Sequence, residues 1–274
     1  MERFHFQRPY SGPLQAVILD WAGTTLDYGS RAPVAALIRA FEQCGVAISV
    51  DQARGPMGKA KKEHIQALME LPDLASRWRE LHNRKPSAQD IDLVYENFLP
   101  IQIKILPEYA ALIPGCLETI SFCRRHNIRI GSSTGYTAEL MKIIMPLARE
   151  QGYEPDTMVC ASDISPGRPA PWMCLENARR LNVYPPQACV KIDDTLVGIE
   201  AGLNAGMWTV GIARTGNLVG LTQAELEQLG REEQESMIAA AKDQLAQCGA
   251  HYVVDSIADV PPVLDDINER LRLG

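Results

Sequence analysis

Short apolar runs alternate with amphipathic helical segments along most of the chain. The first run, AVIL at 16–19, is too short for a helix and lacks a 3.6-residue period, which predicts a strand buried on both faces. Strands are also expected at 128–132, 156–160, 188–192, 208–212 and 251–254, and helices at 116–125, 137–151, 172–181, 197–205, 222–247 and 257–273. This alternation predicts an α/β fold with a doubly wound, mostly parallel sheet.

Between the first two strands lies a long stretch in which every periodic segment is helical. Helices are expected at 33–44, 56–69, 74–82 and 88–105. Ser30 is a candidate N-cap for the first of them. We therefore expect residues 30–106 to form an all-helical cap domain, inserted into an α/β core domain made of residues 1–29 and 107–274.

Composition and charge narrow the class of protein. A content of 46% hydrophobic and 22% charged residues is typical of a soluble globular chain. The net charge of −7 argues against a nucleic-acid partner, although it allows a local basic pocket for a small anion. No apolar run approaches the roughly 20 residues that a membrane span needs, and the N-terminus lacks the apolar core of a signal peptide. Seven cysteines without a CxxC pair favour unpaired thiols, so we expect a cytoplasmic protein.

Polar residues stand at the ends of three predicted strands. Asp20 follows the first strand, SSTG at 132–135 follows the second, and Asp193 and Asp194 follow the strand at 188–192. The carboxyl ends of parallel strands meet at one edge of a sheet, where ligands bind. Asp20 together with Asp193 or Asp194 could hold Mg²⁺, which takes oxygen ligands. Each cluster alone could be turn chemistry, but its recurrence at three strand ends favours a ligand site.

The predicted cap contains a second candidate, in RGPMGKAKKEHI at 54–65. If the helix begins at Pro56, then Met57, Lys61 and His64 share one face and the other two lysines turn away. An amine must be neutral to attack a carbonyl, and burial or neighbouring cations would lower the pKa of Lys61 in that direction. Taken alone, a solvated basic helix face is the simpler interpretation.

Three ordered motifs, DWAGTT, SSTGY and DDT, resemble those of the haloacid dehalogenase superfamily, and the helical insertion after the first motif is similar to its first type of cap. The phosphotransferases of this superfamily form an aspartyl-phosphate on the first Asp. Most have a second Asp two residues later, a general acid for the leaving oxygen, where this chain has Ala22. A methyl group cannot supply that assistance, typically worth about 10²- to 10⁴-fold. A carbon leaving group is then expected, with a lysine imine as its electron sink.

Together with RGPMGKAK, GRPAPWM and NAGMWTVG, these motifs resemble the phosphonatase branch, which hydrolyses phosphonoacetaldehyde to acetaldehyde and phosphate. The resemblance implies that Asp20 is the nucleophile and Lys61 the Schiff-base lysine. It implies that Mg²⁺ is bound by Asp20, the backbone carbonyl of Ala22, and Asp194. The substrate-binding residues that it implies are Thr134 and Gly135 for the phosphonyl oxygens, Arg168 in place of a lysine, and Met57, His64 and Tyr136 around the imine.

Two positions depart from the pattern of the family. An acidic residue often stands four places after the metal-binding Asp, where this chain has Gly198, and Gly often precedes that Asp, where this chain has Asp193. Asp193 could therefore share or even take the metal role. We favour Asp194, because it aligns with the Asp-Thr of the motif.

Other functions stay open on the sequence. One is a different hydrolase of the superfamily, either a haloacid dehalogenase, which needs no metal, or a phosphatase or mutase acting on phosphate esters. Another is a catalytically silent binding protein with the same fold. The resemblance also implies a homodimer, and Leu37, Ile38 and Phe41 on the first cap helix could line its interface. Packing inside the cap is the stronger expectation for these three residues.

Overall fold

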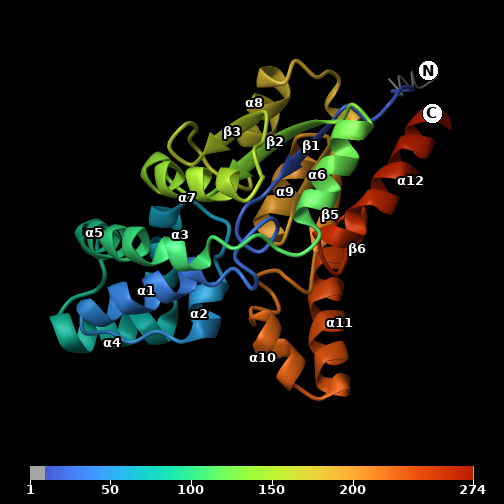
Figure 1. Ribbon diagram of the computed structural model, residues 1–274. Coiled ribbons are helices and arrows are strands. Elements are labelled where there is room, and N and C mark those ends of the chain that lie inside the picture. Colours follow the sequence, from blue (N-terminus) through green and yellow to red (C-terminus); the bar gives the residue numbers. More distant parts are fainter. Residues whose placement is uncertain (1–9, 274) are drawn as a thin grey trace, which may run out of the picture.

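The computed structural model describes residues 10–273 and contains one sheet of six strands, flanked by helices on both faces (Figure 1). The strands are β1 (Ala16–Leu19), β2 (Arg129–Thr134), β3 (Thr157–Cys160), β4 (Cys189–Asp193), β5 (Trp208–Ile212) and β6 (Tyr252–Val254). Every neighbouring pair is parallel, in the order β3-β2-β1-β4-β5-β6. The predicted α/β class and doubly wound sheet are confirmed.

The apolar residues of β1 are fully buried because both faces of the sheet are covered. Val17 and Leu19 contact the layer that contains α6, α7 and α12, whereas Ala16 and Ile18 contact the layer of α8 and α9. The core helices are α6 (Cys116–Arg125), α7 (Ala138–Glu150), α8 (Trp172–Arg180), α9 (Leu196–Asn204), α10 (Gln223–Gln228), α11 (Arg231–Gln247) and α12 (Val260–Leu273), with short 3-10 helices at Leu106–Tyr109, Pro186–Ala188 and Ile257–Asp259.

The order of the strands reverses next to β1. The chain runs from β1 outward through β2 and β3, then returns to the other side of β1 and continues through β4, β5 and β6. Leu19 pairs with Ser132 on one side and with Ile192 on the other, so Asp20, which follows β1, is level with the last residues of β2 and β4. In open α/β sheets, ligands bind at such a reversal, at the carboxyl ends of the strands.

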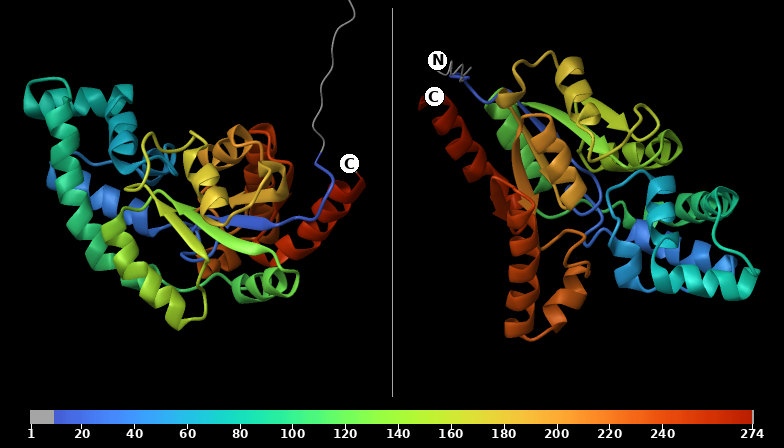
Figure 2. Two further views of the ribbon diagram at one scale, coloured as in Figure 1. Left: turned by 90° about the horizontal axis from the view of Figure 1, so that it is seen from above. Right: turned by 180° about the vertical axis from the view of Figure 1, so that it is seen from behind.

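The inserted helices form a separate layer beside this end of the sheet (Figure 2). They are α1 (Ala32–Gln43), α2 (Val50–Arg54), α3 (Lys61–Met69), α4 (Pro72–His82) and α5 (Ala88–Ile105), and their apolar side chains form a cluster of their own. Leu37 and Phe41 are fully buried in that cluster and Ile38 packs against it, as expected for packing inside the cap. We retain residues 30–106 as the proposed cap.

Two predictions about helix starts were wrong. α3 begins at Lys61 rather than Pro56, because residues 55–59 form turns. Ser30 does not cap α1; it has a φ of 50°, and the carboxylate of Asp27 instead accepts hydrogen bonds from the backbone N–H groups of Arg31 and Ala32.

The C-terminal third also differs in detail from the prediction. The long helix expected at 222–247 is broken into α10 and α11, because Leu229 and Gly230 adopt extended backbone angles between them. The last helix begins at Val260, after a 3-10 turn. Within residues 10–273, none of the helices combines the length and the apolar character that crossing a bilayer requires.

Candidate active site

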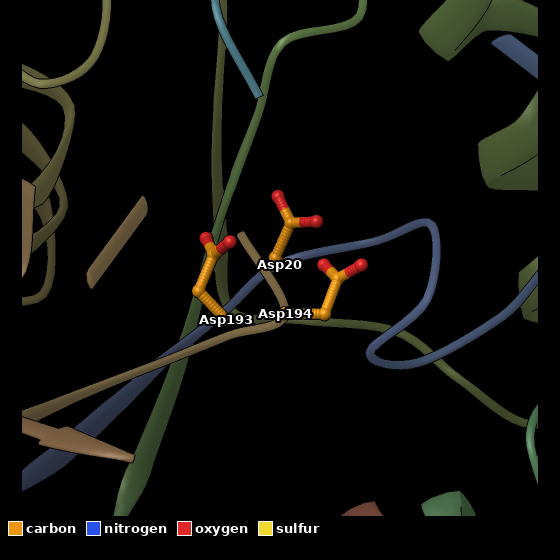
Figure 3. A group of neighbouring side chains, drawn as sticks. All are labelled: Asp20, Asp193 and Asp194. Carbon is orange, nitrogen blue, oxygen red and sulfur yellow. The ribbon is translucent and has the colours of Figure 1, made fainter. Parts of the chain in front are cut away.

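Three buried carboxylates meet where β1 and β4 end. Oxygen atoms of Asp20, Asp193 and Asp194 lie within 4.8 Å of one another, and Figure 3 shows the three groups pointing to the same side. The sheet brings them together, because β1 and β4 are neighbours in register and Asp20 N donates a hydrogen bond to Ile192 O (3.0 Å). The convergence predicted from strand ends is therefore present.

Two buried cations partly neutralise these acids. Arg168 Nη2 donates to Asp20 Oδ1 (2.6 Å) and to the carbonyl of Ser133 (2.6 Å), while Nη1 lies 3.2 Å from Asp193 Oδ2. Lys191 Nζ lies 2.7 Å from the same oxygen of Asp193. Burial alone would lower the pKa of Arg168, but the charges of Asp193 and Asp20 raise it above its usual value. Arg168 is therefore a permanent cation beside Asp20.

The electrostatics of the acids fit a bound divalent cation. Burial, and then the charges of Asp20 and Asp193, raise the pKa of Asp194 well above its ordinary value. Burial also raises the pKa of Asp20, despite Arg168. Crowded carboxylates of this kind resist holding all their negative charges unless a cation joins them. Hard oxygen donors from protein carboxylates and carbonyls are the ligands that Mg²⁺ prefers, so the residues present fit this ion.

The two adjacent acids have different surroundings. Burial tends to raise the pKa of Asp193, but Arg168 and Lys191 hold it below its ordinary value. Its Oδ1 also accepts hydrogen bonds from the N–H (3.0 Å) and hydroxyl (2.7 Å) of Thr195. Asp194 has no cationic partner among the described residues. These contacts support Asp194 rather than Asp193 as a metal ligand.

Gly198 explains why the chain can carry an acid at position 193. A Cβ atom at Gly198 would lie 2.0 Å from the carboxyl carbon of Asp193, so the carboxylate occupies the space of the missing side chain. The two departures from the family pattern therefore depend on each other, because a side chain at position 198 would displace the carboxylate of Asp193.

A small cavity lies between these acids and the cap, with a free volume of about 30 Å³. It is lined by Asp20, Ala22, Ser30, Pro33, Met57, Gly58, Lys59, Lys61, Thr134, Gly135, Tyr136, Arg168 and Thr195. Apart from the acids of the metal cluster, nearly all of the site residues predicted from the sequence therefore line this cavity. This volume holds about one or two water molecules, so a larger ligand does not fit in this arrangement of cap and core.

Lys61 is buried at this cavity without a charged partner. Its side chain is the first of α3, with Nζ 5.4 Å from the centre of the Phe98 ring, and it makes no ion pair with any described residue. Burial lowers the pKa of Lys61 to about 8. At pH 7.5 about a quarter of the amine is then neutral, against about 0.1% at the ordinary value of 10.5.

The other predicted substrate-binding residues divide between the cavity and its surroundings. Met57, Thr134, Gly135 and Tyr136 line the cavity, whereas His64 does not. His64 Nε2 donates to the carbonyl of Ala53 (2.9 Å), since a carbonyl can only accept. Burial, and then the charge of Lys61, lower the pKa of His64 well below its usual value, so the ring is neutral.

Several residues of the site were not identified as site residues from the sequence. Ser30, Pro33, Gly58 and Lys59 line the cavity, and Lys191 pairs with Asp193. Lys59 was expected to turn away, but it belongs to the turn before α3 and not to that helix. Among these residues, only Lys191 stands out in the sequence. It is the one charged residue inside an apolar strand, two residues before the pair Asp193 and Asp194.

A larger cavity, of about 500 Å³, is lined by Trp21 and by residues of α7. Its walls are mostly apolar, with Met141, Met145 and Met158 among them, and none of the predicted site residues lines it. The predicted site residues therefore lie at the smaller cavity and not at the larger one.

The chain is similar to known proteins over most or all of its length. Residues 14–206 match the family model described as haloacid dehalogenase-like hydrolase. The chain is 46% identical to the phosphonoacetaldehyde hydrolase of Syntrophobacter fumaroxidans, over 100% of this chain and 99% of that one, and 46% identical to that of Paraburkholderia phytofirmans, over 95% and 98%. The crystal structure of a phosphonoacetaldehyde hydrolase like protein from Oleispira antarctica superposes with a TM-score of 0.96, at 41% identity, covering 100% of this chain and 99% of that one.

Proposed function

The chain belongs to the phosphonoacetaldehyde hydrolase family of the haloacid dehalogenase-like hydrolases, and from this premise we propose that it cleaves the carbon–phosphorus bond of phosphonoacetaldehyde. The products are acetaldehyde and phosphate. The observation that carries the proposal is a buried lysine of the cap, Lys61, which faces the same small cavity as the buried carboxylate of Asp20 and has no ion-pair partner within residues 10–273. Hydrolysis of a phosphate ester requires no imine and therefore no such amine.

Lys61 begins the reaction as a nucleophile toward carbon. Its neutral amine attacks the aldehyde, and loss of water gives an iminium that can accept an electron pair. Burial supports this role because it lowers the pKa of Lys61 to about 8 and so maintains a reactive fraction near neutral pH. No carboxylate pairs with Lys61 among the described residues to reverse that shift.

Asp20 is the proposed nucleophile toward phosphorus. Arg168 orients it through Oδ1, and its Oδ2 has no hydrogen-bond donor among the described residues. As the Asp20–phosphorus bond forms, the carbon–phosphorus bond breaks and its electron pair moves into the iminium, giving an enamine on Lys61. Protonation and hydrolysis of the enamine release acetaldehyde, and water then releases phosphate from Asp20.

The charge on the phosphonyl oxygens needs compensation, which is the largest electrostatic requirement of phosphoryl transfer. Arg168 supplies a fixed positive charge, and the hydroxyl and backbone donors of Thr134 and Gly135 lie on the cavity wall. We propose Asp20, the carbonyl of Ala22, and Asp194 as the Mg²⁺ ligands. When bound, the ion would neutralise part of the charge on the transferring group.

Ala22 fits a carbon leaving group. It lines the cavity at the position where a general acid would serve an alkoxide, and its methyl group offers no proton. The iminium of Lys61 makes that assistance unnecessary, because the electron pair leaves toward nitrogen. Hydrolysis of simple phosphate esters is accordingly expected to be slow.

The test is turnover of phosphonoacetaldehyde by the purified full-length protein, with and without Mg²⁺, followed by borohydride trapping and peptide mapping. We expect acetaldehyde and phosphate in equal amounts, loss of both with EDTA, and a reduced adduct on Lys61. Lys62→Met is the matched control, because that neighbouring lysine is exposed and pairs with Asp92. A label on another lysine, or full activity in Lys61→Met, contradicts the proposal.

The family likeness also leads us to propose a homodimer. Light scattering of the purified protein checks this point. A monomeric mass at the concentration of the assay would contradict it without affecting the chemistry.

A further inference from the structure

Arg54, the last residue of α2, directs all its guanidinium hydrogen bonds from the cap to the core. Nη1 donates to the carbonyl of Gly29 (2.9 Å) and to both the carbonyl (3.3 Å) and Oδ1 (3.1 Å) of Asn217. Nη2 donates to the carbonyl of Gly220 (2.6 Å). None of these acceptors belongs to residues 30–106, so the side chain of Arg54 is a bridge between the two layers.

Asn217 carries this contact on to the carboxylate cluster. Its Nδ2 donates to the carbonyl of Arg54 (3.3 Å), and its backbone N–H donates to Asp194 Oδ2 (2.8 Å). The other oxygen of Asp194 accepts from the hydroxyl of Thr24 (3.3 Å). One asparagine thus holds both a cap residue and a proposed metal ligand.

The loop that contains Asn217 is shaped around the guanidinium. Gly220 has a φ of 70°, and a Cβ atom there would lie 2.4 Å from the guanidinium carbon of Arg54. A planar group with several donors fits this slot, whereas a lysine would offer a single nitrogen to acceptors in different directions.

Arg54 also precedes the catalytic part of the cap. A run of turns at residues 55–59 connects it to Lys61, the first residue of α3. Docking of Arg54 on the core therefore fixes the start of the segment that places Lys61 at the cavity, while Asn217 fixes Asp194.

We propose that Arg54 is a positioning residue that couples closure of the cap to metal binding at Asp194. The inference rests on the proposed function for the assignment of Asp194 as a metal ligand. A docked Arg54 holds Asn217 and thereby orders Asp194 for the ion. Coupling of this kind is reciprocal, so the ion in turn favours the docked cap.

The first test measures Mn²⁺ binding, by the electron paramagnetic resonance signal of free Mn²⁺, in the full-length protein without substrate. We expect Arg54→Lys and Arg54→Met to weaken Mn²⁺ binding about tenfold. Arg31→Lys is the matched control, since Arg31 also joins the cap segment to the core, through Glu225, but contacts neither Asn217 nor Asp194. Wild-type affinity in both Arg54 variants overturns the proposal.

The second test asks for the reciprocal effect, by hydrogen exchange of residues 50–60 with and without Mn²⁺. The wild type and Arg31→Lys are expected to gain protection with Mn²⁺, and Arg54→Lys is expected to gain none. Equal gains in all three proteins contradict the coupling. Circular dichroism checks that each variant is folded, and if Arg54→Met does not fold, Arg54→Lys decides.

A double variant separates coupling from a general loss of structure. Asn217→Ala keeps the backbone N–H toward Asp194 but removes both side-chain contacts with Arg54. Combined with Arg54→Lys, it should weaken Mn²⁺ binding no further than either change alone, whereas additive losses contradict the bridge. These measurements use no substrate. A wild type that passes them yet releases no acetaldehyde would therefore defeat only the proposed function.

Discussion

Asp20 and Lys61 both face the cavity as buried ionisable groups, but their surroundings are opposite. Asp20, at the end of a central strand, is paired with Arg168 and lies beside two further acids. Lys61, at the start of a cap helix, has an aromatic ring near its ammonium and no ionic partner among the described residues. The core thus gives Asp20 a cationic partner, whereas the cap leaves Lys61 without one among the described residues, and burial lowers its pKa.

The difference fits the two kinds of nucleophile that we propose for this cavity. A carboxylate must stay ionised when buried, and Arg168 and the proposed cation serve that need. An amine must lose its proton, and burial without a partner achieves this. The predictions below test whether this division of roles is correct.

The largest effect is expected from Asp20→Asn, which removes the nucleophile toward phosphorus. Phosphate release should fall by about 10⁴-fold or more, because an amide cannot form the acyl phosphate. Borohydride should still label Lys61 in the presence of substrate. The control is Asp243→Asn, an exposed acid on α11. Loss of label together with activity would mean that the two groups do not act separately.

Lys61→Met should lower the rate of carbon–phosphorus cleavage by about 10³-fold or more, since no electron sink remains for the carbon leaving group. Acetaldehyde release measures this loss. Phosphorylation of Asp20 by acetyl phosphate, detected by mass spectrometry, should survive in the variant. If phosphorylation of Asp20 is lost in Lys61→Met, the reactivity of Asp20 depends on Lys61, and the division of roles between core and cap is wrong.

A third prediction concerns the space beside Gly198 that the carboxylate of Asp193 occupies. Gly198→Ala forces its Cβ against the carboxylate of Asp193 and should lower turnover by about 10- to 100-fold through the displaced partner of Arg168. The double variant Asp193→Gly with Gly198→Asp returns the acid to the same space and should recover part of that activity. No recovery over Asp193→Gly alone would show that the acid must come from position 193.

The pH dependence of imine formation is the next smaller effect. Since burial lowers the pKa of Lys61 to about 8, the rate of borohydride labelling should rise about tenfold per pH unit below 8 and level off above it. A midpoint near the ordinary value of 10.5 would show that the amine is exposed to water.

The smallest effect is on stability. Because Lys61 binds its proton less tightly when folded, the folded state carries a cost below pH 8 that disappears as the pH rises toward 10.5. Lys61→Met should therefore raise the free energy of unfolding at pH 7 by about 1–3 kcal/mol. Urea unfolding measures the change, which should shrink with increasing pH. A loss of stability would show that the amine is not desolvated.

The sequence alone determined the strands, the order of the polar clusters and the edge where they meet. Strand burial on both faces is a local property of runs such as 16–19, and the carboxyl ends of parallel strands lie together whatever the loops do. The family likeness singled out Lys61, and the structure places this residue at the cavity. The helix face inferred from spacing was wrong, because residues 55–59 form turns before α3 begins at Lys61.

Only the tertiary structure decided which charges pair. The packing of strands, loops and cap brings together residues that are far apart in the sequence. It places Lys191 and Arg168 beside Asp193 and leaves space for this acid at Gly198. It also links Arg54 to Asp194 through Asn217. A local pattern places a side chain on a face of its own element. What that side chain pairs with, and hence its pKa, depends on which distant segments pack against that face.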